Sequence, residues 1–301
     1  MYKNFNEIES YVLSGKIVKQ VVLAGSHDMD TLSAVVTASK KGILEPILIG
    51  DEENTSKILT ELGEQPGSYH LIDEPDEVAS AAIACKLVSE GKADIPMKGN
   101  IQTSTFMRAV LDKRLGFVPE GGLLSQATLL EYQRQDRMIV VSDCAVNISP
   151  DYNDKVRIIK NAVALAQKLG SIKPLVAVIA PLETVNPAIP STIDAAMLSK
   201  AAERGQLGNC IVDGPLALDN AVSAEAAEHK QIKSSVAGFA NVLIMPDVCA
   251  GNIFTKSLTF FAQLKSAGCL CGAACPVIMT SRSDTPENKY YAILTAILQS
   301  C

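Results

Sequence analysis

Strand-like and helix-like segments alternate along almost the whole of the 301-residue chain. A Val-rich strand is expected over 18–25 and a helix over 30–41, followed by a strand at 46–49, a helix at 76–89 and a strand at 93–97. The second half repeats this rhythm, with helices expected over 156–169, 191–204, 252–267 and 286–298, and strands at 175–180, 210–212, 240–245 and 277–280. Strands that alternate with such helices predict an α/β fold with parallel or mixed sheets and helices on both faces.

The composition supports this fold and narrows the class of ligand. Apolar residues make up 48% of the chain while aromatic residues make up 5%, so the core must be mostly Ala, Val, Ile and Leu, as in helices packed on a parallel sheet. The opening is polar and no apolar run approaches the roughly 18–20 residues of a membrane span, which predicts a cytoplasmic protein without membrane contact. The net charge of −6 argues against nucleic acid but leaves anionic small substrates open.

Eight cysteines are present, and three of them cluster as Cys269, Cys271 and Cys275. The cluster has no second pair at zinc-ligand spacing and no nearby histidine. We therefore expect no metal site, and interpret the cysteines as reduced thiols that serve as small core residues.

Polar residues follow the strand expected at 93–97, at the sheet edge where ligands of parallel sheets bind. Lys98 and Gly99 come first, and the glycine is expected to let the backbone approach a ligand. Thr103 or Ser104 would cap the next helix and leave N–H groups facing an anion, with Arg108 adding charge. The alternative is a capped helix with two solvated basic residues.

Two further strand ends carry candidate residues. Gly251, Asn252 and Lys256 follow the strand at 240–245, and Lys256 lies off the apolar stripe of its helix, so it is either solvated or faces a site.

The strand at 277–280 ends in the most informative segment, which contains Thr280, Ser281, Arg282, Asp284 and Glu287. An arginine in a loop at a strand end suits an anionic ligand. Asp284 could instead only cap the next helix, and Glu287 could only complement its dipole. We expect the segment 280–282 to be the centre of the chemistry.

Six stretches of the chain, in order and with matching spacing, resemble the phosphate acetyl/butyryltransferase family along nearly the full length of the sequence. The resemblance is closer to its phosphate butyryltransferases than to its phosphate acetyltransferases. The stretches are 97–108, 142–147, 186–194, 210–220, 246–256 and 280–282.

The resemblance implies reversible transfer of a short-chain acyl group, butyryl first, between CoA and inorganic phosphate, with acetyl or propanoyl as alternatives. Acyl-CoA, CoA, phosphate and acyl phosphate are then the partners, no metal or cofactor is needed, and a homodimer or larger assembly is expected. The implied fold has two domains, like isocitrate and isopropylmalate dehydrogenases. Its boundaries would be 1–146 plus 280–301 for one domain and 147–279 for the other, with the active-site cleft between them.

The resemblance also implies residue roles. Ser281 and Arg282 would contact the CoA thiol and the acyl phosphate, while Lys256 and Arg108 would face the substrates. One departure matters, because Asn288 stands where phosphate acetyltransferases carry the aspartate that takes the thiol proton.

The base is therefore unassigned, with Glu287 and Asp284 as candidates. A second departure is the segment 121–123, which is Gly-Gly-Leu where phosphate acetyltransferases tend to place a basic residue.

Two functions of other classes stay open. A dehydrogenase of the related fold would need a cluster of aspartates that binds a metal, and no strand end in the sequence carries one. A non-catalytic CoA-binding protein would not need to keep Ser281, Arg282, Arg108 and Lys256.

Overall fold

The computed structural model describes residues 1–301, which form two compact units. The first unit comprises residues 5–122 and 267–301, and the second comprises residues 1–4 and 123–266. The boundaries predicted from the sequence, at 147 and 280, differ from these bounds. The first difference arises because strands β5 (Ser125–Tyr132) and β6 (Arg137–Ser142) form a hairpin, and β6 pairs with β9 (Val242–Ile244) of the second unit.

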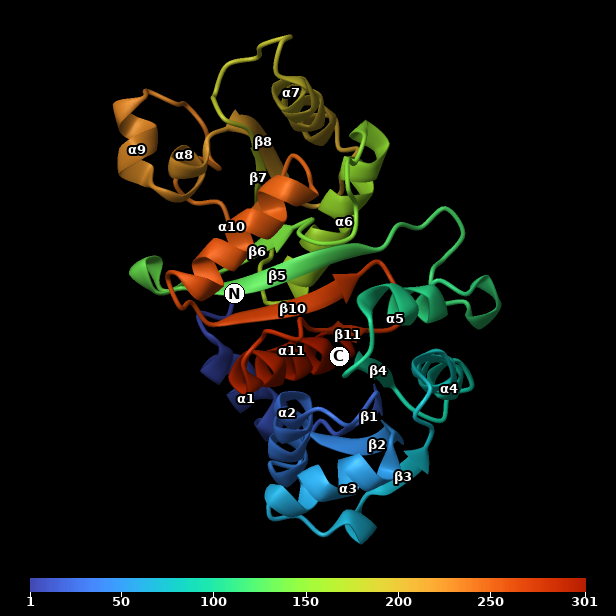
Figure 1. Ribbon diagram of the computed structural model, residues 1–301. Helices are drawn as coiled ribbons and strands as arrows, with labels where there is room; N and C mark the ends of the chain where they lie inside the picture. Colours follow the sequence, from blue (N-terminus) through green and yellow to red (C-terminus); the bar gives the residue numbers. More distant parts are fainter. The chain divides into compact units, whose positions relative to one another are not determined.

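The first unit is built on a five-stranded sheet in the order β11-β4-β1-β2-β3, in which every neighbouring pair is parallel. Helices α2 and α3 lie on one side of β1–β3 and α4 lies on the other (Figure 1). The strands are β1 (Lys19–Ala24), β2 (Leu44–Gly50), β3 (His70–Asp73), β4 (Ile95–Lys98) and β11 (Ile278–Met279). The helices are α1 (Phe5–Ser14), α2 (Met29–Lys40), α3 (Glu52–Glu61), α4 (Glu77–Ser89), α5 (Thr103–Val110) and α11 (Pro286–Gln299).

Helix α11 closes the chain and packs against α2 and α1. Its residues 289–298 are all buried, and a helix that is apolar on nearly every side must lie inside a core. The Tyr291 ring stacks on that of Phe5, with 4.2 Å between the ring centroids. Helix α1 was not predicted, because the first ten residues are mostly polar and only Phe5, Ile8 and Val12 are buried. No helix of the structure, α11 included, is long and apolar enough to cross a membrane.

The second unit contributes to a six-stranded sheet in the order β10-β5-β6-β9-β7-β8. The β5–β6 pair is antiparallel, whereas β6–β9, β9–β7 and β7–β8 are parallel, so the predicted α/β fold with parallel and mixed sheets is confirmed. Phe254 and Leu258 of α10 pack on a core that includes Val141, Ile179 and Leu243. The remaining elements of the second unit are α6 (Tyr152–Lys168), β7 (Leu175–Ile179), α7 (Pro190–Glu203), β8 (Ile211–Leu216), α8 (Leu218–Val222), α9 (Ala224–His229) and α10 (Val248–Phe260). Strand β10 (Ser266–Cys271) starts at the last residue of the second unit, and its other residues belong to the first unit.

The helix predicted over 252–267 is wrong in its second half. Helix α10 ends at Phe260, Gln263 adopts a left-handed φ of 52°, and the chain re-enters a sheet as β10. Small residues with no clear periodicity hid this strand, and strand pairing overrode the local helical pattern.

Cysteines lie mostly inside the fold, and all eight are free thiols. Cys269 and Cys271 are buried in β10, while Cys144 and Cys85 are buried elsewhere. Burial raises the pKa of the Cys144 thiol to about 12, and burial raises that of Cys85 to about 12 as well. These four cysteines therefore pack as small core residues.

Candidate active site

Three neighbouring strands of the first unit end together. In the register of the sheet, Lys98 of β4 lies opposite Ala24 of β1 on one side and opposite Met279 of β11 on the other. The loops that follow these strands therefore leave the sheet at the same edge, which is where parallel sheets bind ligands. Lys98 and the segment 280–282 were predicted for this edge, and the structure brings them together. The loop 25–28 after β1 completes the group.

Lys98 is almost fully buried, with 2% of its surface exposed. Its ammonium group donates one hydrogen bond, to the carbonyl oxygen of Gly99 at 3.2 Å. Burial, followed by the positive charges of Arg282 and Lys289, lowers the pKa of Lys98 to about 8, and the carboxylates of Asp28 and Asp284 offset only part of this effect.

A second buried lysine, Lys289, lies in the first turns of α11, with 1% of its surface exposed. Its Nζ lies 3.2 Å from Oδ2 of Asp28, which also caps α2 by accepting a hydrogen bond from the Thr31 backbone N–H at 2.9 Å. Burial raises the pKa of the Asp28 carboxyl, but hydrogen bonds from Thr31 and Lys289 outweigh burial, so that its pKa is lowered.

Neither Asp28 nor Lys289 was predicted as a site residue. A single lysine beside an otherwise apolar helical run was the signal that could have identified Lys289.

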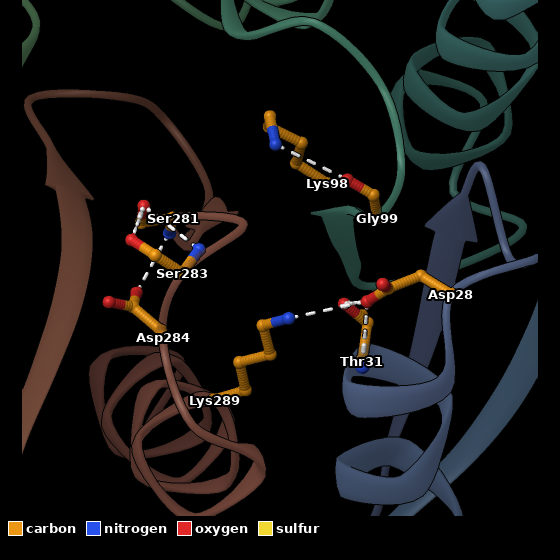
Figure 2. A network of polar contacts seen from close by, with 8 residues as sticks. All are labelled: Asp28, Thr31, Lys98, Gly99, Ser281, Ser283, Asp284 and Lys289. Atoms are coloured by element: carbon orange, nitrogen blue, oxygen red, sulfur yellow. Dashed lines mark hydrogen bonds and ion pairs between the residues drawn. The ribbon is translucent and has the colours of Figure 1, made fainter.

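Residues 281–284 form a closed turn at the end of β11. The Ser281 N–H donates to Asp284 at 2.8 Å, and the Ser281 hydroxyl lies 2.9 Å from the Ser283 hydroxyl. Figure 2 shows this turn beside Lys98 and Lys289, with Asp28 facing Lys289 from the loop before α2. The turn holds Ser281 and exposes Arg282.

The two carboxylates of this segment have structural partners. Asp284 does not cap α11, because Thr285 is the N-cap and accepts from the Asn288 N–H at 3.2 Å. Asp284 instead braces the turn through Ser281. Glu287 accepts a hydrogen bond from the Tyr291 hydroxyl at 2.5 Å. Both candidate bases therefore also stabilise local structure.

Three cations gather at this edge, namely Lys98, Lys289 and Arg282. The positive charges of Arg282 and Lys289 act on Lys98 more strongly than the carboxylates of Asp28 and Asp284. Two of the cations are buried, where an uncompensated positive charge is costly. A bound anion at this edge would offset the positive charge, and lysine and arginine are both suited to hold phosphate oxygens.

The residues around α5 depart from the predictions. A Cβ atom on Gly99 would lie 2.2 Å from the carbonyl oxygen of Gly25, so this glycine permits a close approach of the backbone after β1. Thr103 and Ser104 do not cap α5, because Gln102 is the N-cap and makes no side-chain capping bond.

Both residues lie in the first turn of α5 and are exposed, as is Arg108. The structure does not group these three side chains with the buried lysines in any polar contact that it shows.

The other candidate residues lie in the second unit, around the loop 143–147. The buried Asp143 carboxylate accepts hydrogen bonds from the N–H groups of Ala145 at 2.8 Å and Val146 at 3.0 Å. A Cβ atom on Gly251 would lie 2.2 Å from the Asp143 carbonyl oxygen, so only glycine permits this contact of α10 with the loop.

Asn252 donates to the Cys144 carbonyl oxygen at 3.1 Å, which ties the same loop to α10. Lys256 is exposed one turn further along the helix. Gly251 and Asn252 thus shape the loop, and Lys256 is available to a ligand.

Ser191 and Asp194 have the spacing of a helix capping box, but neither side chain caps α7. Helix α7 begins after Ile189 without a side-chain cap, and Asp194 pairs at 2.5 Å with Lys155 of α6, whose side chain is 5% exposed. Asp194 therefore has a structural role in joining two helices.

The fold is that of an α/β protein whose parallel sheet carries a group of cations at one edge. Residues 72–297 match the model of the phosphate acetyl/butaryl transferase family, and the chain belongs to this family, which confirms the resemblance predicted from its motifs. The chain is 42% identical over 298 residues to the phosphate butyryltransferase of Clostridium acetobutylicum, covering 99% of this chain and 98% of the relative.

Two more relatives agree in class. The chain is 42% identical over 275 residues to the phosphate acetyltransferase of Thermotoga maritima, covering 91% of this chain and 93% of that one. The crystal structure of a branched-chain phosphotransacylase from Enterococcus faecalis superposes with a TM-score of 0.83 at 32% identity, covering 94% of this chain and 99% of that chain.

Proposed function

We propose that this chain transfers a short-chain acyl group, butyryl in preference to acetyl or propanoyl, between CoA and inorganic phosphate. The observation that carries the proposal is the group of three cations formed by Lys98, Lys289 and Arg282 around the ends of β4 and β11. Phosphate and acyl phosphate both present a doubly charged anion to such a group. The relationship to butyryltransferases along the full chain supports butyryl as the acyl group.

The chemistry follows from the charges that change during the reaction. Toward acyl-CoA, the thiol of CoA attacks the carbonyl carbon of the acyl phosphate, and phosphate leaves after a negatively charged tetrahedral state. Arg282 and the buried lysines hold the phosphoryl oxygens and stabilise the charge that develops. Ser281, fixed by its turn, orients the thiol. The reverse reaction is phosphorolysis of acyl-CoA through the same state.

The approximate free-energy contributions indicate which part of the catalysis is largest. A thiol of pKa about 8.5 is roughly 3% ionised at pH 7, so full ionisation before attack is worth only about 2 kcal/mol. One donor to a developing oxyanion contributes about 3–4 kcal/mol, and orientation of the reactants contributes roughly 7–11 kcal/mol. Charge stabilisation and positioning therefore outweigh the base.

Arg282→Ala is accordingly expected to lower kcat/KM by about two orders of magnitude or more, since it removes a donor to the phosphoryl oxygens. Glu287→Ala should lower it less, because Glu287 is hydrogen-bonded to Tyr291. Steady-state phosphorolysis rates of the two variants test this order. If Glu287→Ala were the more damaging change, base catalysis by that carboxylate would replace charge stabilisation as the main contribution.

The substrate is tested by phosphate-dependent release of free thiol from acetyl-, propanoyl-, butyryl- and isobutyryl-CoA. The proposal predicts the highest kcat/KM for butyryl-CoA or its branched isomer. A clear preference for acetyl-CoA would assign a phosphate acetyltransferase instead, and CoA binding without turnover of any of the four would indicate a non-catalytic protein.

Four expectations from the sequence accompany this proposal. CoA and phosphate act as substrates with no further cofactor or metal, the protein works as a homodimer or larger assembly, and it resides in the cytoplasm. The likeness to isocitrate and isopropylmalate dehydrogenases stays a prediction of the same kind.

A further inference from the structure

The thiol proton has no evident acceptor among the expected carboxylates. Asn288 stands at the place of the family aspartate and an amide cannot accept a proton at neutral pH. Asp284 accepts from the Ser281 backbone, and Glu287 accepts from the Tyr291 hydroxyl. Each carboxylate thus stabilises a turn or a helix.

Among the other titratable groups at this edge, which include His27 in the loop after β1, Lys98 is the one whose strand, β4, pairs with β11 just before the turn that holds Ser281. It lies opposite Met279 in the sheet, two residues before Ser281. Its nitrogen makes one hydrogen bond, to the Gly99 carbonyl, so two further positions on the ammonium are left for substrate atoms. No carboxylate neutralises it by direct contact, in contrast to Lys289, which pairs with Asp28.

Surrounding charges make the neutral amine accessible. Burial lowers the pKa of Lys98 most, and the positive charges of Arg282, in the turn after β11, and of Lys289, in α11, lower it further. Together they exceed the opposing effect of the carboxylates of Asp28 and Asp284, so the pKa of Lys98 falls to about 8. At that value about a tenth of the amine is neutral at pH 7, against roughly 0.04% for an ordinary lysine. An acid–base group works best when its pKa is close to the working pH.

We propose that Lys98 carries the proton of the reaction, an inference that rests on the function proposed above. The neutral amine takes the proton from the CoA sulfur as the S–C bond forms. As the bond between the acyl carbon and the phosphate oxygen breaks, the electron pair stays on that oxygen, and the Lys98 ammonium returns the proton to it. The acyl phosphate dianion and the thiol thereby become thioester and HPO₄²⁻, with no net proton released.

Phosphorolysis is the direction that tests this step, because neither reactant is a thiol. By microscopic reversibility the neutral amine then takes the proton of HPO₄²⁻ and delivers it to the departing sulfur. The concentration of the phosphate dianion is held constant at every pH. Under this condition, kcat/KM for butyryl-CoA should rise about tenfold per pH unit up to pH about 8 and then stay constant.

Lys98→Arg is the discriminating variant, because guanidinium keeps the positive charge and does not deprotonate. It should lose at least about 100-fold in kcat/KM and lose the rising limb near pH 8, while CoA binding measured by calorimetry persists. Lys57→Arg, an exposed lysine of α3, is the matched control and should leave the profile unchanged. If Lys98→Arg does not fold, Lys98→Gln takes its place, and the residual kcat/KM of Lys98→Gln should then show no rise with pH below pH about 8.

Each result decides between a proton carrier and a fixed charge. A Lys98→Arg enzyme within tenfold of the wild type, a limb that persists in Lys98→Gln, or a wild-type profile that is flat from pH 7 to 9 would overturn the role given to Lys98 but leave the proposed function standing. A wild-type protein that phosphorolyses none of the four acyl-CoA substrates would remove the proposed function itself.

Discussion

The ion pair between Asp28 and Lys289 provides a sharp test of how the strand-end charges are balanced. Asp28→Asn removes the negative charge but leaves the helix cap, because asparagine and aspartate are equally good N-cap residues. Lys289, 1% exposed, would then be a buried cation beside two others, Lys98 and Arg282. The change therefore isolates the charge from the cap.

Breaking a buried pair by removing one partner costs about 3–5 kcal/mol. The side chain of Asp28 is 30% exposed, which favours the lower figure, so we expect Asp28→Asn to lose about 3 kcal/mol. This is a large share of the roughly 5–15 kcal/mol by which proteins are stable. The loss should be read from the urea midpoint at pH 7 with an unchanged m-value.

Asp76→Asn is the matched control, because Asp76 caps α4 in the same way but faces solvent. It should cost well under 1 kcal/mol. The double variant Asp28→Asn/Lys289→Met removes both charges and should be more stable than Asp28→Asn alone, since replacing both partners of a buried pair is close to neutral. The reasoning fails if Asp28→Asn costs no more than Asp76→Asn, or if adding Lys289→Met restores nothing.

The pH dependence of the same pair has a definite sign. The pKa of Asp28 is lowered in the folded protein, because the hydrogen bonds from Thr31 and Lys289 outweigh the burial that raises it. Its contribution is therefore complete above the unfolded pKa of about 3.9 and is lost as the pH falls through the lower folded pKa. The stability difference between wild type and Asp28→Asn should be constant from pH 5 to 7 and shrink below pH about 4, as measured by urea unfolding. A difference that grows on acidification would contradict this assignment.

The other predictions concern packing. Gly99→Ala places a methyl group 2.2 Å from a backbone carbonyl oxygen, so it should shift the strand-end loop and clearly lower the urea midpoint. Gly67→Ala is the control, because its methyl group meets nothing within 4 Å and should leave the midpoint unchanged. Equal midpoints for the two variants would show that the loop moves without cost. Asp194→Ala leaves the buried Lys155 unpaired and should cost about 3–5 kcal/mol in the same assay; a loss below 1 kcal/mol would mean that water reaches that lysine.

Most of the fold could be predicted from the sequence, because most strands and helices carry strong local patterns. The strand expected at 18–25 and the helix at 30–41 are observed as β1 and α2, with Asp28 as the cap. The elements that were missed, α1 and β10, have weak local signals. Helix α1 follows a polar opening, and β10 is rich in small residues and is fixed by its neighbours in the sheet.

Site residues that directly follow strand ends could be predicted from the sequence, whereas residues that pair across a long sequence separation could not. Lys98 and Ser281 follow directly from the rule that parallel strands end at a common edge. Asp28 and Lys289 are separated by 261 positions, and no periodic pattern can indicate that such residues meet. The capping role expected of Thr103 or Ser104 was wrong because the hydroxyl that a sequence offers as a cap need not be used when the helix begins one residue earlier.

The central claim is that the chain couples cleavage of an acyl-CoA to the use of phosphate. Purified protein mixed with butyryl-CoA and phosphate, followed by ³¹P NMR and by free-thiol titration, measures both products at once. We predict that acyl phosphate and free CoA appear in equal amounts and that neither forms when phosphate is omitted. Release of CoA without phosphate, or no release of CoA although butyryl-CoA binds, would contradict the assignment of a phosphate acyltransferase.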